Sequence, residues 1–247
     1  MWFMNTSFIS ANLAIIRQRI KTAAQSAGRD ANDIRLLLAT KTVSAELIAE
    51  AISAGETLIG ENKVQELKQK DPVLSSRSIE RHFIGHLQTN KIKDVLKYVT
   101  CIQSVDKKEL LEKLDSRLQF EGRSIDILIQ VNTSFEESKF GIHPDNAIDL
   151  LRFAKKYDTL NIRGLMTIGL FEADAEKVRP SFRSLKQIRE EAIDQGLLGE
   201  ESSLSMGMSG DLETAIQEGA TIVRVGTAIF GKRIYPDSYY WNEQQTA

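Results

Sequence analysis

The chain has 247 residues, of which 42% are hydrophobic and 27% charged, and its formal net charge at neutral pH is −2. This balance does not provide the broad basic surface that holds nucleic-acid phosphates, so we expect no nucleic-acid partner. The one cysteine, Cys101, excludes an intramolecular disulfide framework and is typical of a reducing cytosol. The first ten residues have neither a basic start nor a sustained apolar run. We therefore expect no signal peptide, no membrane anchor and a cytoplasmic location.

The hydrophobic pattern alternates between helical and strand periodicity from the start of the chain. Apolar residues at helical spacing predict a first helix over residues 9–27, which Gly28 ends, and IRLLLAT from Ile34 predicts the first strand. Ser44 is expected to cap the next helix, and TLIGEN at residues 57–62 predicts the second strand. Strand and helix therefore follow one another as in a parallel α/β protein.

Further strand segments follow, separated by helical patterns such as the one over 87–98. They are RHFIG, VTCIQSV, SIDILIQVN, NIRGLMTIG, LSMGM and TIVRVGTAIFG, in chain order. Asp106 and Glu109 are expected to form a capping pair for the helix after the fourth strand. Pro180 is expected to open the helix after the sixth strand, and Ser209 to cap the helix after the seventh.

Eight strand–helix units in a chain of this length predict a single (β/α)8 TIM barrel with an extra N-terminal helix. The domain is expected to span residues 1–247, with its core at about 9–231. An open α/β sheet is the alternative, although no dinucleotide fingerprint follows the first strand.

Polar side chains end several of the predicted strands, where a barrel of this kind has its active site. They include Lys41, Asn62, His86, Asn132 and Arg224. Burial at the end of an apolar strand favours the neutral amine of Lys41, which is nucleophilic, so this residue suggests Schiff-base chemistry. The alternative is a lysine that reaches solvent or pairs with a carboxylate such as that of Glu61.

The loops after the seventh and eighth strands, SMGMSGDLETAI and IVRVGTAIFG, predict a phosphate site. Gly207 and Gly210 permit a close backbone approach, and Gly226 with Thr227 offers unobstructed amides and a hydroxyl. A helix cap and a packing glycine are the structural alternative. Strand alternation places Arg224 inside the barrel below this site, where it needs an internal carboxylate or a ligand ring nitrogen as acceptor.

Two other residue types receive structural interpretations. His82 and His86 are four residues apart, but they lie on a strand and do not share a helical face, so a metal site is not expected. Cys101 lies within an apolar strand, which favours a place in the core over a role as nucleophile.

Taken together, the motifs resemble those of the pyridoxal phosphate homeostasis protein family, single-domain relatives of the barrel domain of alanine racemase. They are TK at 40–41, GEN at 60–62, HFIGHLQTNK at 82–91, SVD at 104–106, QVNTSFEESKFG at 130–141, GLMTIG at 164–169, LSMGMSGD at 204–211 and VRVGTAIFG at 223–231. The resemblance implies that Lys41 carries pyridoxal 5'-phosphate (PLP) as a Schiff base and that Arg224 faces the pyridine nitrogen. The implied cofactor-binding set is Lys41, Asn62, Met206, Ser209, Arg224, Gly226 and Thr227.

The resemblance also implies a function in vitamin B6 and amino-acid homeostasis, in which the protein carries or buffers PLP with little or no catalysis. An arginine facing the ring nitrogen is only a donor, so it leaves that nitrogen unprotonated and weakens the cofactor as an electron sink. The sequence ends shortly after the eighth strand, without room for the second domain of a racemase. We expect a monomer, with PLP-dependent apoenzymes as candidate partners.

Two enzymatic alternatives remain open. The first is a PLP-dependent amino-acid racemase or decarboxylase that draws its second base from the barrel mouth, with His86 as the candidate. The second is a barrel aldolase that uses Lys41 directly on a sugar phosphate.

Overall fold

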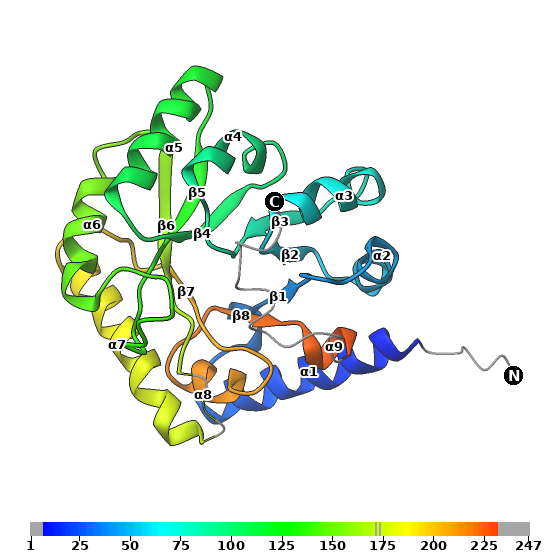
Figure 1. The fold of residues 1–247 in the computed structure, drawn as a ribbon. Coiled ribbons are helices and arrows are strands. Elements are labelled where there is room, and N and C mark those ends of the chain that lie inside the picture. Colours follow the sequence, from blue (N-terminus) through cyan, green and yellow to red (C-terminus); the bar gives the residue numbers. More distant parts are fainter. Residues whose placement is uncertain (1–6, 171, 173, 232–247) are drawn as a thin grey trace, which may run out of the picture.

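The structure, a computed structural model, describes residues 7–170, 172 and 174–231. In this part of the chain, eight parallel strands close into a barrel in which each strand pairs with the next and β8 pairs with β1 (Figure 1). The strands are β1 (Arg35–Ala39), β2 (Leu58–Glu61), β3 (Glu80–Phe83), β4 (Cys101–Val105), β5 (Ile125–Gln130), β6 (Leu160–Met166), β7 (Ser203–Ser205) and β8 (Ile222–Val225). The predicted (β/α)8 barrel is confirmed.

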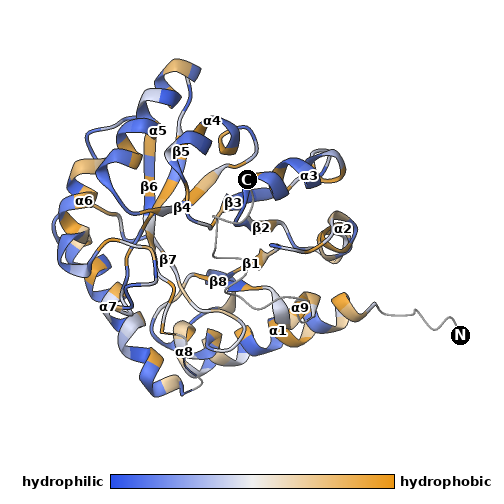
Figure 2. Ribbon diagram, viewed as in Figure 1, coloured by the Kyte–Doolittle hydropathy of each residue, from blue (hydrophilic) through white to orange (hydrophobic). Residues whose placement is uncertain are grey.

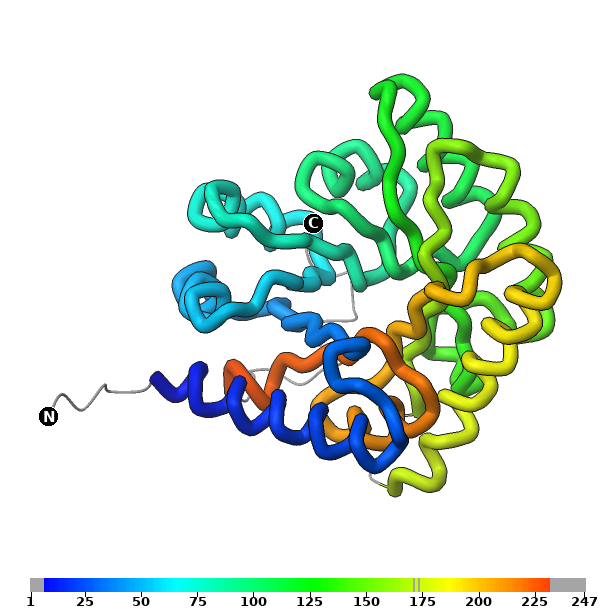
Figure 3. Tube along the Cα trace, turned by 180° about the vertical axis from the view of Figure 1, so that it is seen from behind, coloured from blue at the N-terminus to red at the C-terminus, as the bar shows by residue number. Residues whose placement is uncertain are grey.

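Helices surround the barrel, and the first of them completes the ring. They are α1 (Phe8–Ser26), α2 (Ala45–Ser53), α3 (Val64–Leu74), α4 (Ile92–Val95), α5 (Lys108–Glu121), α6 (Ala147–Ala154), α7 (Ala175–Asp194), α8 (Leu212–Gln217) and α9 (Thr227–Phe230). The predicted N-terminal helix, α1, packs against α2, α8 and α9, as Figures 1 and 3 show. Because α9 has only four residues, α1 takes the outer position that a longer eighth helix would fill.

Side chains on the strands alternate between the barrel interior and the surrounding helices. On β1, Leu36 and Leu38 belong to the main core beneath the helices, whereas Leu37 clusters separately with Leu58 and Ile222. Figure 2 shows hydrophobic residues along β4, β5 and β6 and mixed colours on the helices around them. Leu58 and Ile222 begin their strands, so apolar side chains fill the barrel at its N-terminal end.

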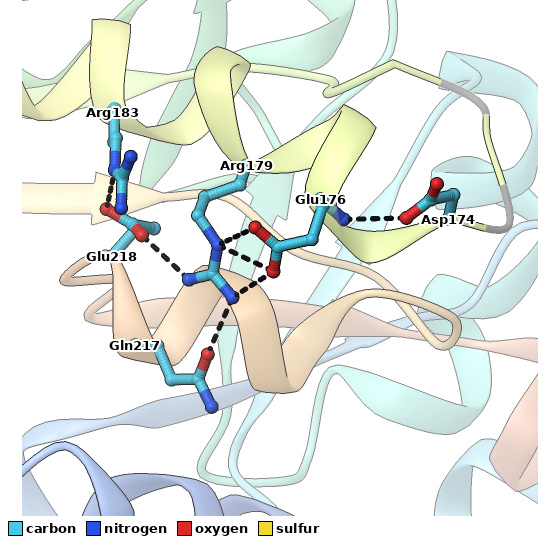
Figure 4. Close-up of polar contacts among 6 residues, drawn as sticks. All are labelled: Asp174, Glu176, Arg179, Arg183, Gln217 and Glu218. Carbon is cyan, nitrogen blue, oxygen red and sulfur yellow. Dashed lines mark hydrogen bonds and ion pairs between the residues drawn. The ribbon is translucent and has the colours of Figure 1, made fainter.

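An ion-pair network fastens α7 to α8 (Figure 4). Arg179 donates hydrogen bonds to Glu218 at 2.7 Å and to Gln217 at 3.1 Å, and it also pairs with Glu176 on its own helix. Glu218 accepts a second hydrogen bond from Arg183 at 3.1 Å. The hydrogen bonds to Glu176 and Glu218 raise the pKa of Arg179 above its ordinary value. The network holds the end of α8, the helix that follows β7, against α7.

The predicted capping pair at α5 is wrong. Lys107 is the N-cap residue of this helix, and no side chain caps its first turn. The backbone amide of Gly141, in the loop after β5, instead lowers the pKa of Asp106 against the larger effect of burial. The Asp106 carboxyl group is therefore close to this loop, which the sequence distance to Glu109 does not reveal.

The predicted start of α7 at Pro180 is also wrong. The helix begins at Ala175, and the side chain of Asp174 caps it by accepting a hydrogen bond from the amide of Glu176 at 3.0 Å. Pro180 lies inside the helix, where its missing amide removes only the bond to the carbonyl of Glu176.

Three other boundaries differ from the prediction. TIVRVGTAIFG is not one strand: β8 ends at Val225, and Gly226 leaves the extended conformation so that α9 can begin. Ser209 does not cap α8, because Asp211 takes the N-cap position. Residues 87–98 form a 3₁₀ turn followed by the short α4, and not one long helix.

Candidate functional site

The strand register brings the predicted site residues to one end of the barrel. Ala39 of β1 pairs with Gly60 of β2, and β1 also pairs with β8 up to Val225. Lys41 therefore follows β1 at the level where Asn62 follows β2 and where β8 turns into α9. A Cβ atom on Gly226 would lie 2.8 Å from the Ala39 carbonyl oxygen, so only glycine allows the two strand ends to pass this closely.

Lys41 is half-buried and lies between two threonines whose backbones are held in place. Thr42 has a φ of 64°, which is unusual for a β-branched residue. The alternative prediction, that Lys41 pairs with Glu61, does not agree with the structure. The Glu61 carboxylate binds Lys70 and Thr40 instead, each at 2.6 Å. The sequence analysis did not identify Lys70, because a lysine in the predicted helix VQELKQK is typically exposed to solvent.

Arg224 projects into the barrel, as strand alternation predicts, and only 5% of its surface is exposed. Its Nη1 donates to the hydroxyl of Ser205 at 2.8 Å, and its Nη2 donates to the carbonyl oxygen of Thr167 at 2.7 Å. Burial lowers the pKa of Arg224 to about 10, so it remains a cation at neutral pH. Both acceptors are neutral, and among the described residues no carboxylate forms an ion pair with this guanidinium.

A chain of buried hydrogen bonds continues from Ser205 across the barrel. The Ser205 hydroxyl donates to Oε1 of Gln103 at 2.6 Å, and Nε2 of Gln103 lies 2.7 Å from Nδ1 of His82. Nε2 of His82 lies 3.5 Å from a carboxylate oxygen of Glu80. Because an amide nitrogen can only donate, Nδ1 of His82 must accept and the ring proton must be on Nε2. All donors therefore point the same way, from Arg224 to Glu80, and Gln103 is a second contributor that the sequence reasoning missed.

The two predicted phosphate loops meet, and α1 braces both of them. The hydroxyl of Thr227 donates to the hydroxyl of Ser209 at 3.3 Å, which brings together the loops after β7 and β8. From α1, Arg19 donates to the Ser209 carbonyl at 3.0 Å and Asn12 donates to the Ile229 carbonyl at 2.9 Å. The N-terminal helix thus fixes both loops.

Met206 is placed differently from the other members of the predicted set. Its side chain is fully buried in the main core beneath the helices, and its amide donates to the Ile222 carbonyl at 3.1 Å. The structure does not bring this side chain to the barrel mouth, so only main-chain atoms of Met206 are available to a ligand there.

The side of the mouth opposite β8 carries His86 and Asp106. The His86 ring stacks on Phe140, with ring centroids 3.8 Å apart and an interplanar angle of 12°. Burial raises the pKa of Asp106, and the nearby His86 opposes this effect. His86 is therefore held by an aromatic contact next to a half-buried carboxyl group.

Four buried oxygens at or just after the ends of β2 and β4 have no hydrogen-bond partner among the described residues. They are Oε2 of Glu61, Oδ1 of Asn62, Oγ of Ser104 and Oδ1 of Asp106. Buried polar atoms are seldom left without a partner, so these oxygens indicate space for a polar ligand.

Other kinds of site find little support in residues 7–170, 172 and 174–231. No group of three or more His, Cys, Asp or Glu side chains in these ranges is arranged to hold a metal ion. Cys101 is buried inside the barrel with Leu128 and Met166, and burial raises the pKa of its thiol, as a core residue requires. None of the helices described has the length and apolar character needed to cross a membrane.

Comparisons with known proteins agree with this geometry. Residues 11–234 match the family model of the alanine racemase N-terminal domain. The pyridoxal phosphate homeostasis protein of Aquifex aeolicus is 42% identical over 223 residues, which cover 90% of this chain and 97% of that protein. The corresponding protein of Pasteurella multocida is 39% identical, with 92% and 98% covered.

Solved structures extend the comparison. PipY of Synechococcus elongatus with PLP bound has a TM-score of 0.79 and 32% identity, covering 90% of this chain and all of that one. An alanine racemase of Clostridium difficile has a TM-score of 0.71 at 14% identity, covering 93% of this chain and 58% of the racemase. The racemase shares the barrel fold.

Proposed function

Because the chain belongs to the pyridoxal phosphate homeostasis protein family, we propose that it binds PLP reversibly as a Schiff base on Lys41. The observation that carries this proposal is the arrangement of Lys41, which follows β1, and Arg224 on the adjacent strand β8, together with the Ser209–Thr227 contact. The PLP-bound PipY structure supports the choice of cofactor.

The hydrogen-bond donors of the site and its unpartnered buried oxygens fit this cofactor. In the proposal, the Lys41 amine would form the covalent bond, Arg224 would donate to the ring nitrogen, and Ser209, Gly226 and Thr227 would hold the phosphate. Asn62, with its unpartnered buried oxygen, would contact the ring. Met206 contributes main-chain atoms only, because its side chain lies in the core.

The support for weak catalysis comes from Arg224. When bound, the cofactor supplies an electrophilic aldehyde carbon and a ring that can withdraw electrons. A carboxylate beside the ring nitrogen would keep that nitrogen protonated, whereas a guanidinium has no acceptor and can only donate to it. The hydrogen bonds to Ser205 and Thr167 hold the guanidinium in place in the barrel. A ring nitrogen facing it would therefore accept a hydrogen bond and would not be protonated. Lys41 and Arg224 therefore bind and orient the aldehyde without activating it strongly.

We accordingly assign the protein a role as carrier or buffer of PLP in vitamin B6 and amino-acid homeostasis. PLP-dependent apoenzymes are the candidate recipients of the cofactor, and a single domain acting as a monomer is the simplest form that such a carrier needs. The names of the relatives from Aquifex aeolicus and Pasteurella multocida support the homeostasis role.

The test is the absorbance spectrum of protein incubated with PLP, before and after reduction with borohydride. Wild-type protein should develop a Schiff-base band, and peptide mass spectrometry should find the reduced adduct on Lys41. Lys41→Ala should abolish both signals, while Lys93→Ala, a change at an exposed lysine of α4, should leave them intact. A wild-type protein that takes up no PLP would overturn the proposal.

The racemase or decarboxylase alternative makes a different prediction. An enzyme with His86 as second base should exchange the α-hydrogen of an amino acid with deuterium from solvent faster than free PLP does. The proposed carrier should show no such excess for any member of an amino-acid panel, and a rate that falls on His86→Ala would favour the enzyme.

A further inference from the structure

A buried lysine outside the predicted site lies directly behind the loop that carries Lys41. Lys70, on α3, is 8% exposed. Its ammonium donates to the carbonyl oxygen of Thr40 at 2.8 Å, to Oε1 of Glu61 at 2.6 Å and to Oε2 of Glu66 at 2.7 Å. An ammonium has three donors, so this geometry uses all of them.

The same acceptors hold the residues on either side of Lys41. Oε2 of Glu66 also accepts the backbone amide of Thr42 at 2.6 Å. The hydroxyl of Thr40 donates to Oε1 of Glu61 at 2.6 Å. The chain is therefore fixed immediately before and immediately after Lys41, at a carbonyl on one side and an amide on the other.

Thr42 shows why this loop needs outside support. Its φ of 64° lies in the left-handed region, which a β-branched side chain disfavours. The turn contributes one bond of its own, from the Val43 amide to the Thr40 carbonyl at 3.0 Å. The Thr40 amide also donates to the Gly60 carbonyl of β2 at 2.9 Å. The Thr40 carbonyl and the Thr42 amide are held by Lys70 and Glu66 of α3, which are 28 and 24 positions away from Thr42 and outside the local turn.

We propose that Lys70 is a positioning residue for Lys41: its ammonium, with Glu61 and Glu66, fixes the β1–α2 loop so that the Lys41 amine is presented to the cofactor. This inference rests on the proposed function and assigns a role to Glu66 and Lys70, to which the sequence analysis gave none. Lys70 itself touches no cofactor atom in this assignment, and its effect passes through the backbone on both sides of Lys41.

The first test follows the loop itself, without any ligand. In Lys70→Met, the Thr40 carbonyl loses the hydrogen bond from Lys70, and the Glu66 carboxylate that accepts the Thr42 amide loses its cation. The amides of Thr42 and Val43 should therefore exchange with deuterium about tenfold faster than in wild type. Lys68→Met is the matched control, because it makes the same change on an exposed position of the same helix. Equal exchange rates in the two folded variants would overturn the proposal.

A second variant guards against an unfolded Lys70→Met protein, in which Glu61 would be left as an unpaired buried carboxylate. Glu61→Gln with Lys70→Met removes both buried charges, and it should still release the Thr42 amide. A folded double variant with wild-type exchange at this amide would likewise overturn the proposal.

The third measurement links the loop to the cofactor. The rate at which PLP becomes borohydride-fixable on Lys41 should fall about tenfold in the Lys70 variants and stay unchanged in Lys68→Met. An unchanged capture rate in a variant with faster loop exchange would refute the positioning role. If wild-type protein captures no PLP, the proposed function fails, and the exchange rates alone still decide whether Lys70 fixes the loop.

Discussion

Replacing Ser205 by alanine should disconnect Arg224 from the polar interior of the barrel. Ser205 is fully buried, accepts from Nη1 of Arg224 and donates to Oε1 of Gln103. The change leaves one guanidinium donor and one amide oxygen without a partner, and each such group costs about 1–3 kcal/mol when water cannot reach it. We expect the free energy of unfolding to fall by about 3 kcal/mol.

Urea unfolding of the purified protein measures this loss, and Ser53→Ala is the control. The Ser53 hydroxyl only donates to the Ala49 carbonyl of its own helix, at 2.9 Å, so its removal should cost less than about 0.5 kcal/mol. The effects of Ser205→Ala and Gln103→Leu should be less than additive, because both break the same chain. A Ser205 variant as stable as the Ser53 control would refute the hydrogen-bond chain as a support of Arg224.

Three further predictions concern other parts of the site. Burial raises the pKa of Glu61 from 4.5 to about 7, so the stability that its protonated form contributes is complete below pH 4.5 and lost as the pH rises through 7. Between these values the wild type should lose up to about 3 kcal/mol relative to Glu61→Gln in urea unfolding, and parallel pH profiles would contradict this. Arg19→Leu removes the hydrogen bond that this partly exposed side chain donates to the Ser209 carbonyl. The affinity for PLP, measured by titration, should fall about threefold to tenfold. An unchanged affinity would count against bracing of the loop by α1. Gly226→Ala should lower the free energy of unfolding by about 2 kcal/mol, because the new Cβ atom would clash with the Ala39 carbonyl oxygen of β1. Gly210→Ala is the control: its Cβ would lie in open space, and the free energy of unfolding should change by less than about 1 kcal/mol. Equal effects of the two variants would refute the steric argument.

The sequence could predict those features of the site that depend on strand periodicity. An apolar run that ends in a polar residue places that residue at the mouth of a parallel barrel, and the structure has Lys41 and Asn62 at that position. Alternation within β8 correctly turned Arg224 inwards and its neighbours Val223 and Val225 towards the helices. These inferences need only the chain direction and a period of two.

The supports of the site could not be predicted in the same way. Lys70 has the sequence surroundings of an exposed helical lysine, and it is buried only because the ends of β1 and β2 pack against that position of α3. Gln103 and Ser205 are 102 positions apart, and no local pattern shows that one amide will accept from one hydroxyl. Such contacts follow from the closure of the barrel, which brings together residues that are unrelated along the chain.

The contacts that hold Arg224 and those that hold the loop of Lys41 share a property that suits a site for a cofactor with a reactive carbonyl and a phosphate. Ser205 and the Thr167 carbonyl hold Arg224 without cancelling its charge, so the guanidinium keeps its attraction for an electron-rich ring atom or an anion. Behind Lys41, the ammonium of Lys70 balances the carboxylate of Glu66, and burial raises the pKa of Glu61 to about 7, so that its carboxyl group is only partly ionised at neutral pH. An additional ionised carboxylate there would favour the ammonium form of Lys41, which cannot attack a carbonyl. Each support therefore fixes a functional side chain while adding little net charge to the mouth, which a simple ion pair to either residue would not achieve.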